Sequence, residues 1–159
     1  MKIRADFVTN SSSSSFILGF SSEKGIEEEL SNGFPKWAIG KIETVIEDVL
    51  SADKFDKEEA IKRIREEMRW TAKYHVEERY RRRTGCSYSE SFGYGNTRDG
   101  KMEIEKYLDE IVENTIIKMN GKSIFVEVSY SDGDGGYYSE LEHEIMPVVD
   151  STMIRFSHH

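Results

Sequence analysis

Acidic and histidine side chains gather near the C-terminal end of the sequence, and their types suit metal or proton chemistry. Three of the four histidines lie within the last seventeen residues, beside several aspartates and glutamates. Carboxylate oxygens and imidazole nitrogens together bind divalent metals such as zinc or manganese, and the same groups act as general acids and bases. The predicted metal ligands are Asp132, Asp134, His143, His158 and His159.

The spacing of these residues matches no established metal motif. An EF-hand loop that began in the DGDGG segment would need an oxygen-bearing side chain at Gly136 and a glutamate at His143. The HExxH pattern does not occur either. Acidic glycine-rich segments are commonly plain turns, and terminal residues commonly fray, so a purely structural interpretation stays open.

A run of five serines near the N-terminal end offers a second kind of site. The segment FVTNSSSSSFI lies between apolar stretches, so we expect a polar loop that joins two strands. Such a loop can bind an anion through backbone N–H groups, and its hydroxyls are targets for phosphorylation. The alternative is a locally hydrogen-bonded turn, because no GxxxxGK[ST] pattern is present. The predicted binding or modification residues are Asn10, Ser11, Ser12, Ser13, Ser14 and Ser15.

The same segment resembles a group of uncharacterised bacterial and phage-associated proteins. The resemblance covers roughly a tenth of the chain. It implies no activity and transfers no functional residue. The residues that carry it are Phe7, Val8, Asn10, Ser11 to Ser15 and Phe16, with Thr9 where serine is more usual.

Arginines mark the end of the longest predicted helix. The net charge of −8 argues against nonspecific nucleic-acid binding, which depends on phosphate contacts. Arg81, Arg82 and Arg83 leave a local nucleic-acid contact open as an alternative to a solvated helix end. Trp70 and Tyr74 could stack on bases, or could pack beneath another segment.

Bulk composition limits the class of protein. A chain of 159 residues suits one domain, 1–159, and its single cysteine, Cys86, excludes an internal disulfide. The first residues, MKIRADFV, lack the apolar region of a signal peptide, and no stretch is apolar enough to span a bilayer. We therefore expect a cytoplasmic protein with no membrane association.

Hydrophobic periodicity predicts strands near both ends and helices between them. Alternating or continuous apolar residues predict strands at 2–8, 16–20, 123–130 and 152–158. Helical spacing predicts helices at 21–30, 35–50, 57–83, 101–119 and 139–146, the last with Ser139 as N-cap. Residues 84–100 lack either period and predict a long loop.

These elements predict an α+β fold, with a small mixed sheet of about four strands covered by three to five helices. If the strands at 123–130 and 152–158 flank a crossover helix, they are parallel neighbours. Their C-terminal ends then bring the acidic turn and the terminal histidines to the same end of the sheet.

Two functions compete on these grounds. The first is a non-catalytic binding or regulatory module whose serine-rich loop is recognised or modified, with another protein as partner. The alternative is a small metal-dependent enzyme that acts on phosphoester or nucleotide substrates through the C-terminal Asp/His cluster.

Overall fold

The computed structural model describes residues 13–131 and 136–158. The chain divides into two compact units. The sheet unit comprises Met1–Lys57 and Met119–His159, and the helical unit comprises Glu58–Lys118. The assignment of residues 1–159 to a single domain stays a prediction.

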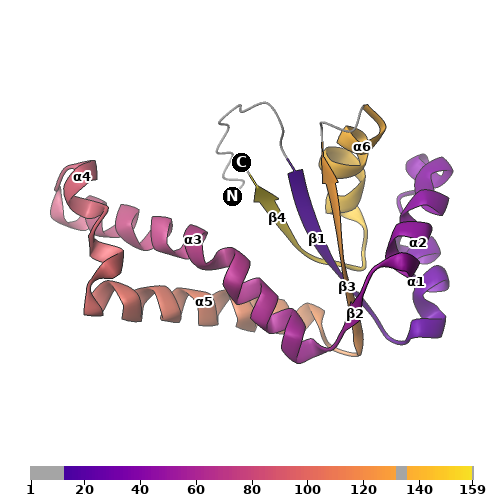
Figure 1. The fold of residues 1–159 in the computed structure, drawn as a ribbon, viewed down its shortest axis with the longest axis horizontal. Helices are drawn as coiled ribbons and strands as arrows, with labels where there is room; N and C mark the ends of the chain where they lie inside the picture. Colours follow the sequence, from indigo (N-terminus) through magenta and orange to yellow (C-terminus); the bar gives the residue numbers. More distant parts are fainter. Residues whose placement is uncertain (1–12, 132–135, 159) are drawn as a thin grey trace. The chain divides into compact units, whose positions relative to one another are not determined.

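Four strands form one sheet in the described part of the sheet unit (Figure 1). The predicted α+β fold with a small sheet is confirmed, but all three strand pairs are antiparallel, so the sheet is not mixed. The strand predicted at 2–8 lies outside the described residues. The strands are β1 (Ser13–Phe20), β2 (Lys54–Phe55), β3 (Ile124–Ser131) and β4 (Thr152–His158), in the order β2-β3-β1-β4.

The predicted pairing of the two C-terminal strands is wrong, because β1 lies between β3 and β4. β1 is buried along nearly its whole length, which suits an inner position in the sheet, and it pairs with both. Ser13 lies opposite Ser131 on one side and His158 on the other. The C-terminal ends of β3 and β4 therefore do lie at the same end of the sheet.

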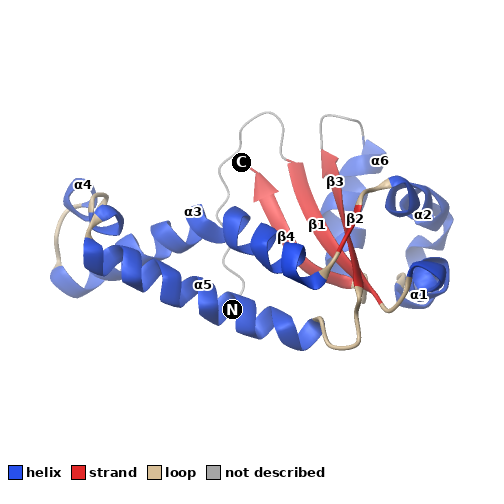
Figure 2. Cartoon of the chain, turned by 60° about the horizontal axis from the view of Figure 1, so that its bottom comes forward, coloured by secondary structure: helices blue, strands red, loops and turns tan. Residues whose placement is uncertain are grey.

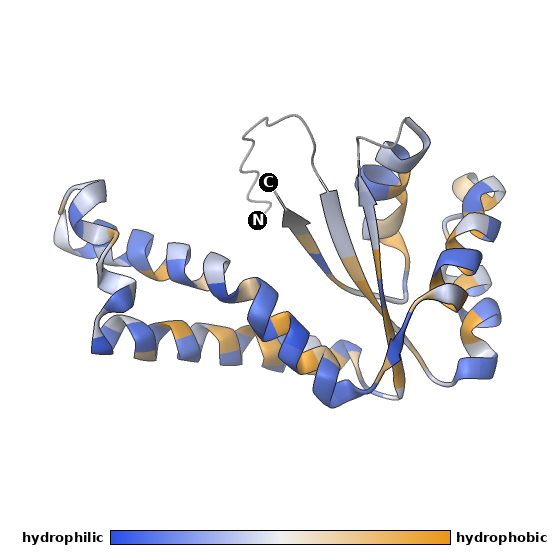
Figure 3. Cartoon of the chain, viewed as in Figure 1, coloured by the Kyte–Doolittle hydropathy of each residue, from blue (hydrophilic) through white to orange (hydrophobic). Residues whose placement is uncertain are grey.

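β1 also begins earlier than its apolar residues indicate. Ser13, Ser14 and Ser15, predicted to lie in a loop, are the first residues of the strand. The hydroxyl groups of Ser14 and Ser15 have hydrogen-bond partners inside the fold, which allows polar side chains to be buried there. In Figure 3 this serine end of β1 is pale, and the apolar residues that follow are orange.

Helices cover one face of this sheet. The buried core on that face joins residues of β1 and β3 to residues of the helical segments. The sheet contributes Phe16, Leu18, Phe20, Val126, Val128 and Tyr130. The helices of this unit are α1 (Ile26–Gly33), α2 (Ile42–Ser51) and α6 (Gly136–Glu140), with shorter turns at Glu23–Gly25, Lys36–Lys41, Leu141–Ile145 and Met146–Val148.

The helical unit is built on two long helices (Figure 2). α3 (Lys57–Thr84) and α5 (Arg98–Lys118) share a core that contains Ala72, Val76 and Leu108. Ion pairs from Arg65 and Arg69 to Glu105 support the same packing.

The loop predicted at 84–100 instead holds α4 (Tyr88–Ser91), the turn Tyr94–Asn96 and the start of α5. Two local interactions that hydrophobic periodicity does not detect order this segment. Ser87 and Glu90 form a capping box. The ring of Tyr94 stacks on Tyr80 with centroids 4.0 Å apart. In the described part of the chain, no helix has both the length and the apolar character needed to cross a membrane.

Candidate functional site

A π-helical turn presents the acidic residue at the centre of the candidate site. α6 continues into the turn Leu141–Ile145, where the N–H of Met146 bonds to the carbonyl of Leu141. Such wide turns are rare in proteins, and many of those that occur lie at functional sites. The predicted N-cap at Ser139 is wrong, because the helix already begins at Gly136 and places Ser139 inside it.

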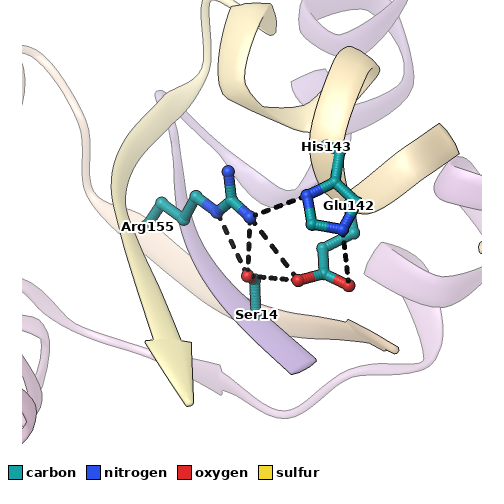
Figure 4. Close-up of polar contacts among 4 residues, drawn as sticks. All are labelled: Ser14, Glu142, His143 and Arg155. Atoms are coloured by element: carbon teal, nitrogen blue, oxygen red, sulfur yellow. Dashed lines mark hydrogen bonds and ion pairs between the residues drawn. The ribbon is translucent and has the colours of Figure 1, made fainter. Parts of the chain in front are cut away.

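Glu142, on this turn, reaches across to the start of β1. The hydroxyl of Ser14 donates a hydrogen bond of 2.7 Å to Oε1 of Glu142 (Figure 4). Arg155 on β4 donates to the same hydroxyl oxygen from Nε at 3.1 Å and from Nη2 at 2.9 Å. Arg155 pairs with Phe16 in the sheet, two residues from Ser14, so both polar side chains lie on the helix-covered face.

The Ser14 hydroxyl is fully engaged. A serine hydroxyl has one proton to donate and two lone pairs to accept with. Glu142 takes the proton, and the two Arg155 nitrogens occupy the acceptor positions. Ser14 is also completely buried. This hydroxyl is therefore a structural group, without the access or the spare lone pair that a nucleophile needs.

Glu142 is a buried carboxylate with an incomplete set of partners. Its side chain is 0% exposed, and burial of an unpaired charge is costly. Arg155 Nη2 lies 3.5 Å from Oε1 and supplies the opposite charge. Among the described residues, Oε2 has no hydrogen-bond partner, and Nε2 of His143 lies 3.7 Å from it.

His143 closes the cluster on its solvent side. Its Nδ1 lies 3.4 Å from Nη2 of Arg155. A guanidinium has only donors, so Nδ1 must accept, and the ring proton is assigned to Nε2, which faces Glu142. Ser14, Glu142, His143 and Arg155 together form what we call the Ser14 cluster (Figure 4). The side chains of His143 and Arg155 are 42% and 30% exposed, so this cluster has a polar rim over a buried anion.

The structure describes only part of each predicted site. Asn10, Ser11 and Ser12 lie outside the described residues, Ser13 is half-buried, and Ser14 and Ser15 are buried in β1. Of the predicted metal ligands, His143 lies in the Ser14 cluster. Asp132, Asp134, His159 and the side chain of His158 lie outside the described residues. Within 13–131 and 136–158, no three His, Cys, Asp or Glu residues are grouped to hold a metal.

The inward position of Arg155 does not follow from the apolar pattern of its strand. Apolar alternation points Ile154 and Phe156 inward and Arg155 outward, yet Arg155 lies over the ring of Phe16, 5.7 Å from its centroid. One signal was available in the sequence. Arg155 is the sole lysine or arginine after Lys122, in a segment rich in acids. A buried acid in that segment has few other local sources of positive charge.

The three arginines at the end of α3 are already engaged with acids of their own unit. Arg81 and Arg82 both contact Glu78, and Arg83 lies 3.8 Å from Glu103. Hydrogen bonds from Arg81 and Arg82 lower the pKa of Glu78 from its ordinary 4.5 to about 2. Much of the positive charge at this helix end is therefore balanced locally.

Trp70 stacks on Tyr74 in the same helix, with their rings 10° from parallel. Trp70 is 74% exposed, so it does not pack beneath another described segment.

Comparisons of the chain with protein-family models, with curated proteins and with solved structures find no match.

Proposed function

We propose that this protein is a non-catalytic binding or regulatory module, and that its serine run (Asn10 to Ser15) is recognised or modified by a protein partner. The observation that carries the proposal is the state of Ser14. Its hydroxyl is buried and fully hydrogen-bonded, so it anchors the inner end of the run rather than performing chemistry.

This anchoring divides the serine run into two parts. Ser14 and Ser15 are buried, and Ser15 Oγ lies 2.6 Å from Ser129 Oγ, so a kinase reaches neither hydroxyl without local opening of β1. Recognition is therefore assigned to the outer residues, Asn10, Ser11 and Ser12.

Mass spectrometry of the protein purified from its host of origin tests this proposal. We expect either a covalent mass increase on the outer serines or a protein that co-purifies in a stable ratio. An unmodified serine run together with the absence of any co-purifying protein contradicts it.

One observation favours the metal-dependent enzyme as a second candidate. The C-terminal ends of β3 and β4 lie on either side of Ser13, so Ser131, which precedes Asp132 in the sequence, and the backbone of His158 lie at the same sheet end. Metal analysis of the wild type and of the His143→Ala/His158→Ala variant tests this candidate. It predicts a bound divalent metal that the double variant loses, and equal metal content in both proteins rejects it.

A further inference from the structure

A cavity of about 290 Å³ lies at the edge of β3. Its lining comes from α2, β3 and α6 and includes four consecutive strand residues, 127–130. Successive strand residues point to opposite faces of a sheet. Four consecutive strand residues can line one cavity only where the cavity borders the strand backbone. The cavity therefore lies along the edge of β3.

The strand edge continues past the end of β2. β2 pairs with Phe125 and Val126, and the cavity begins directly beyond this pair. In an antiparallel pair of strands, every second residue directs its N–H and C=O toward the paired strand, and the residues between them direct theirs to the opposite side. Along Val128, Ser129 and Tyr130, alternate residues therefore direct their N–H and C=O to the side opposite β1, where the cavity lies. Such an edge is a template for an added strand.

The side chains around this edge are acidic and aromatic. Asp48 and Glu127 line the cavity together with Tyr130 and Tyr138, and no lysine or arginine within 13–131 or 136–158 lines it. The Tyr130 hydroxyl donates to Oδ2 of Asp48 at 3.1 Å and fixes the orientation of that carboxylate. The helical unit holds as many basic as acidic residues, so the whole net charge of −8 belongs to the sheet unit.

We propose that the β3 edge (Val128, Ser129 and Tyr130) binds an extended segment of a partner protein that carries lysine or arginine at alternate positions. The segment adds a strand in line with β2, and its basic side chains on the helix-covered face meet Asp48. The inference extends the proposed binding function but uses a surface separate from the serine run.

Selection from a phage-displayed library of random twelve-residue peptides tests this proposal, with the enriched sequence then made as a synthetic peptide. We expect enriched sequences with alternating basic residues and no proline at their centre. Methylation of one alternate set of peptide N–H groups should weaken binding about tenfold or more, and methylation of the other set should change it less than about twofold. If the peptide were recognised through its side chains alone, the two methylation patterns should have equal effects on binding.

Variants of the protein locate the contact. Asp48→Asn should weaken the peptide about fivefold to tenfold, and Asp48→Lys should weaken it further, because each removes the attraction for the basic side chain. Glu43→Lys, on an exposed position of the same helix outside the cavity, is the matched control and should have little effect. Circular dichroism of each variant establishes that it is folded.

Three results overturn the proposal: no enriched peptide, equal effects of the two methylation patterns, or binding that is indifferent to both Asp48 variants. The serine-run variant Ser11→Ala/Ser12→Ala should bind the peptide normally. Failure of this edge therefore remains distinguishable from failure of the function proposed for the serine run.

Discussion

The hydroxyl of Ser14 and the carboxylate of Glu142 meet at 2.7 Å, although 128 residues separate them in the chain. Their hydrogen bond connects the first residues of β1 to the π-helical turn Leu141–Ile145, which lies over the sheet. Arg155 contacts both groups from the neighbouring strand. The four-residue Ser14 cluster thus connects three segments that are distant in the sequence. Ser14, one of the five consecutive serines, therefore has a structural role.

Ser14→Ala should lower the free energy of unfolding by about 1–3 kcal/mol, because it removes the donor to a buried carboxylate. Urea unfolding followed by fluorescence measures the change. Ser31→Ala is the control, since the Ser31 hydroxyl is exposed and donates within α1, to the carbonyl of Glu27. It should cost less than about 0.5 kcal/mol. Equal losses in both variants would show that the Ser14 hydroxyl does not anchor β1.

The Arg155 and Glu142 side chains should be energetically coupled. Arg155→Met leaves the Glu142 carboxylate buried without its main counter-charge, and we expect a loss of about 1–3 kcal/mol after allowing for the partial exposure of Arg155. Adding Glu142→Gln should recover part of that loss, because the uncompensated charge is gone. A double-mutant cycle by urea unfolding gives the coupling energy, and strictly additive losses would refute it.

Gly100 should tolerate no side chain. A Cβ at Gly100 would lie 2.0 Å from the carbonyl oxygen of Tyr94, a backbone atom that cannot move aside cheaply. Gly100→Ala should therefore destabilise the helical unit by about 1–3 kcal/mol or more. Gly93→Ala, where nothing lies within 4 Å of the added carbon, is the control. Thermal unfolding that ranks the two variants equally would contradict this close approach.

Glu78 should make the helical unit sensitive to acid. Its pKa is lowered to about 2 by Arg81 and Arg82, below the ordinary 4.5. A lowered folded-state pKa contributes stability that is complete above pH 4.5 and is lost as the pH falls toward 2. Glu78→Gln should remove this contribution, so the difference in stability between wild type and variant should shrink across that range. A difference that stays constant from pH 5 to pH 2 would exclude the pairing.

The sequence predicts the helical unit better than the Ser14 cluster, for a physical reason. α3 spans Lys57–Thr84 against a predicted 57–83, because its apolar stripe and its arginine-rich end are local signals. The extension of β1 to Ser13 depends instead on partners far along the chain, such as Glu142 and Ser129. Serine carries no apolar periodicity, so neither this extension nor the inward position of Arg155 follows from spacing.

The central claim is that the outer serines are recognised and that Ser14 anchors the strand. It is tested most directly by measuring partner binding and covalent modification in two variants purified from the host of origin. Ser11→Ala/Ser12→Ala should lose the co-purifying protein or the covalent mass increase while unfolding at the same urea concentration as wild type. Ser14→Ala should keep that partner or mass increase while unfolding at a lower urea concentration. The opposite pattern, with Ser14 essential for recognition and the outer serines dispensable, would contradict the division of the run into an outer recognised part and an inner anchor.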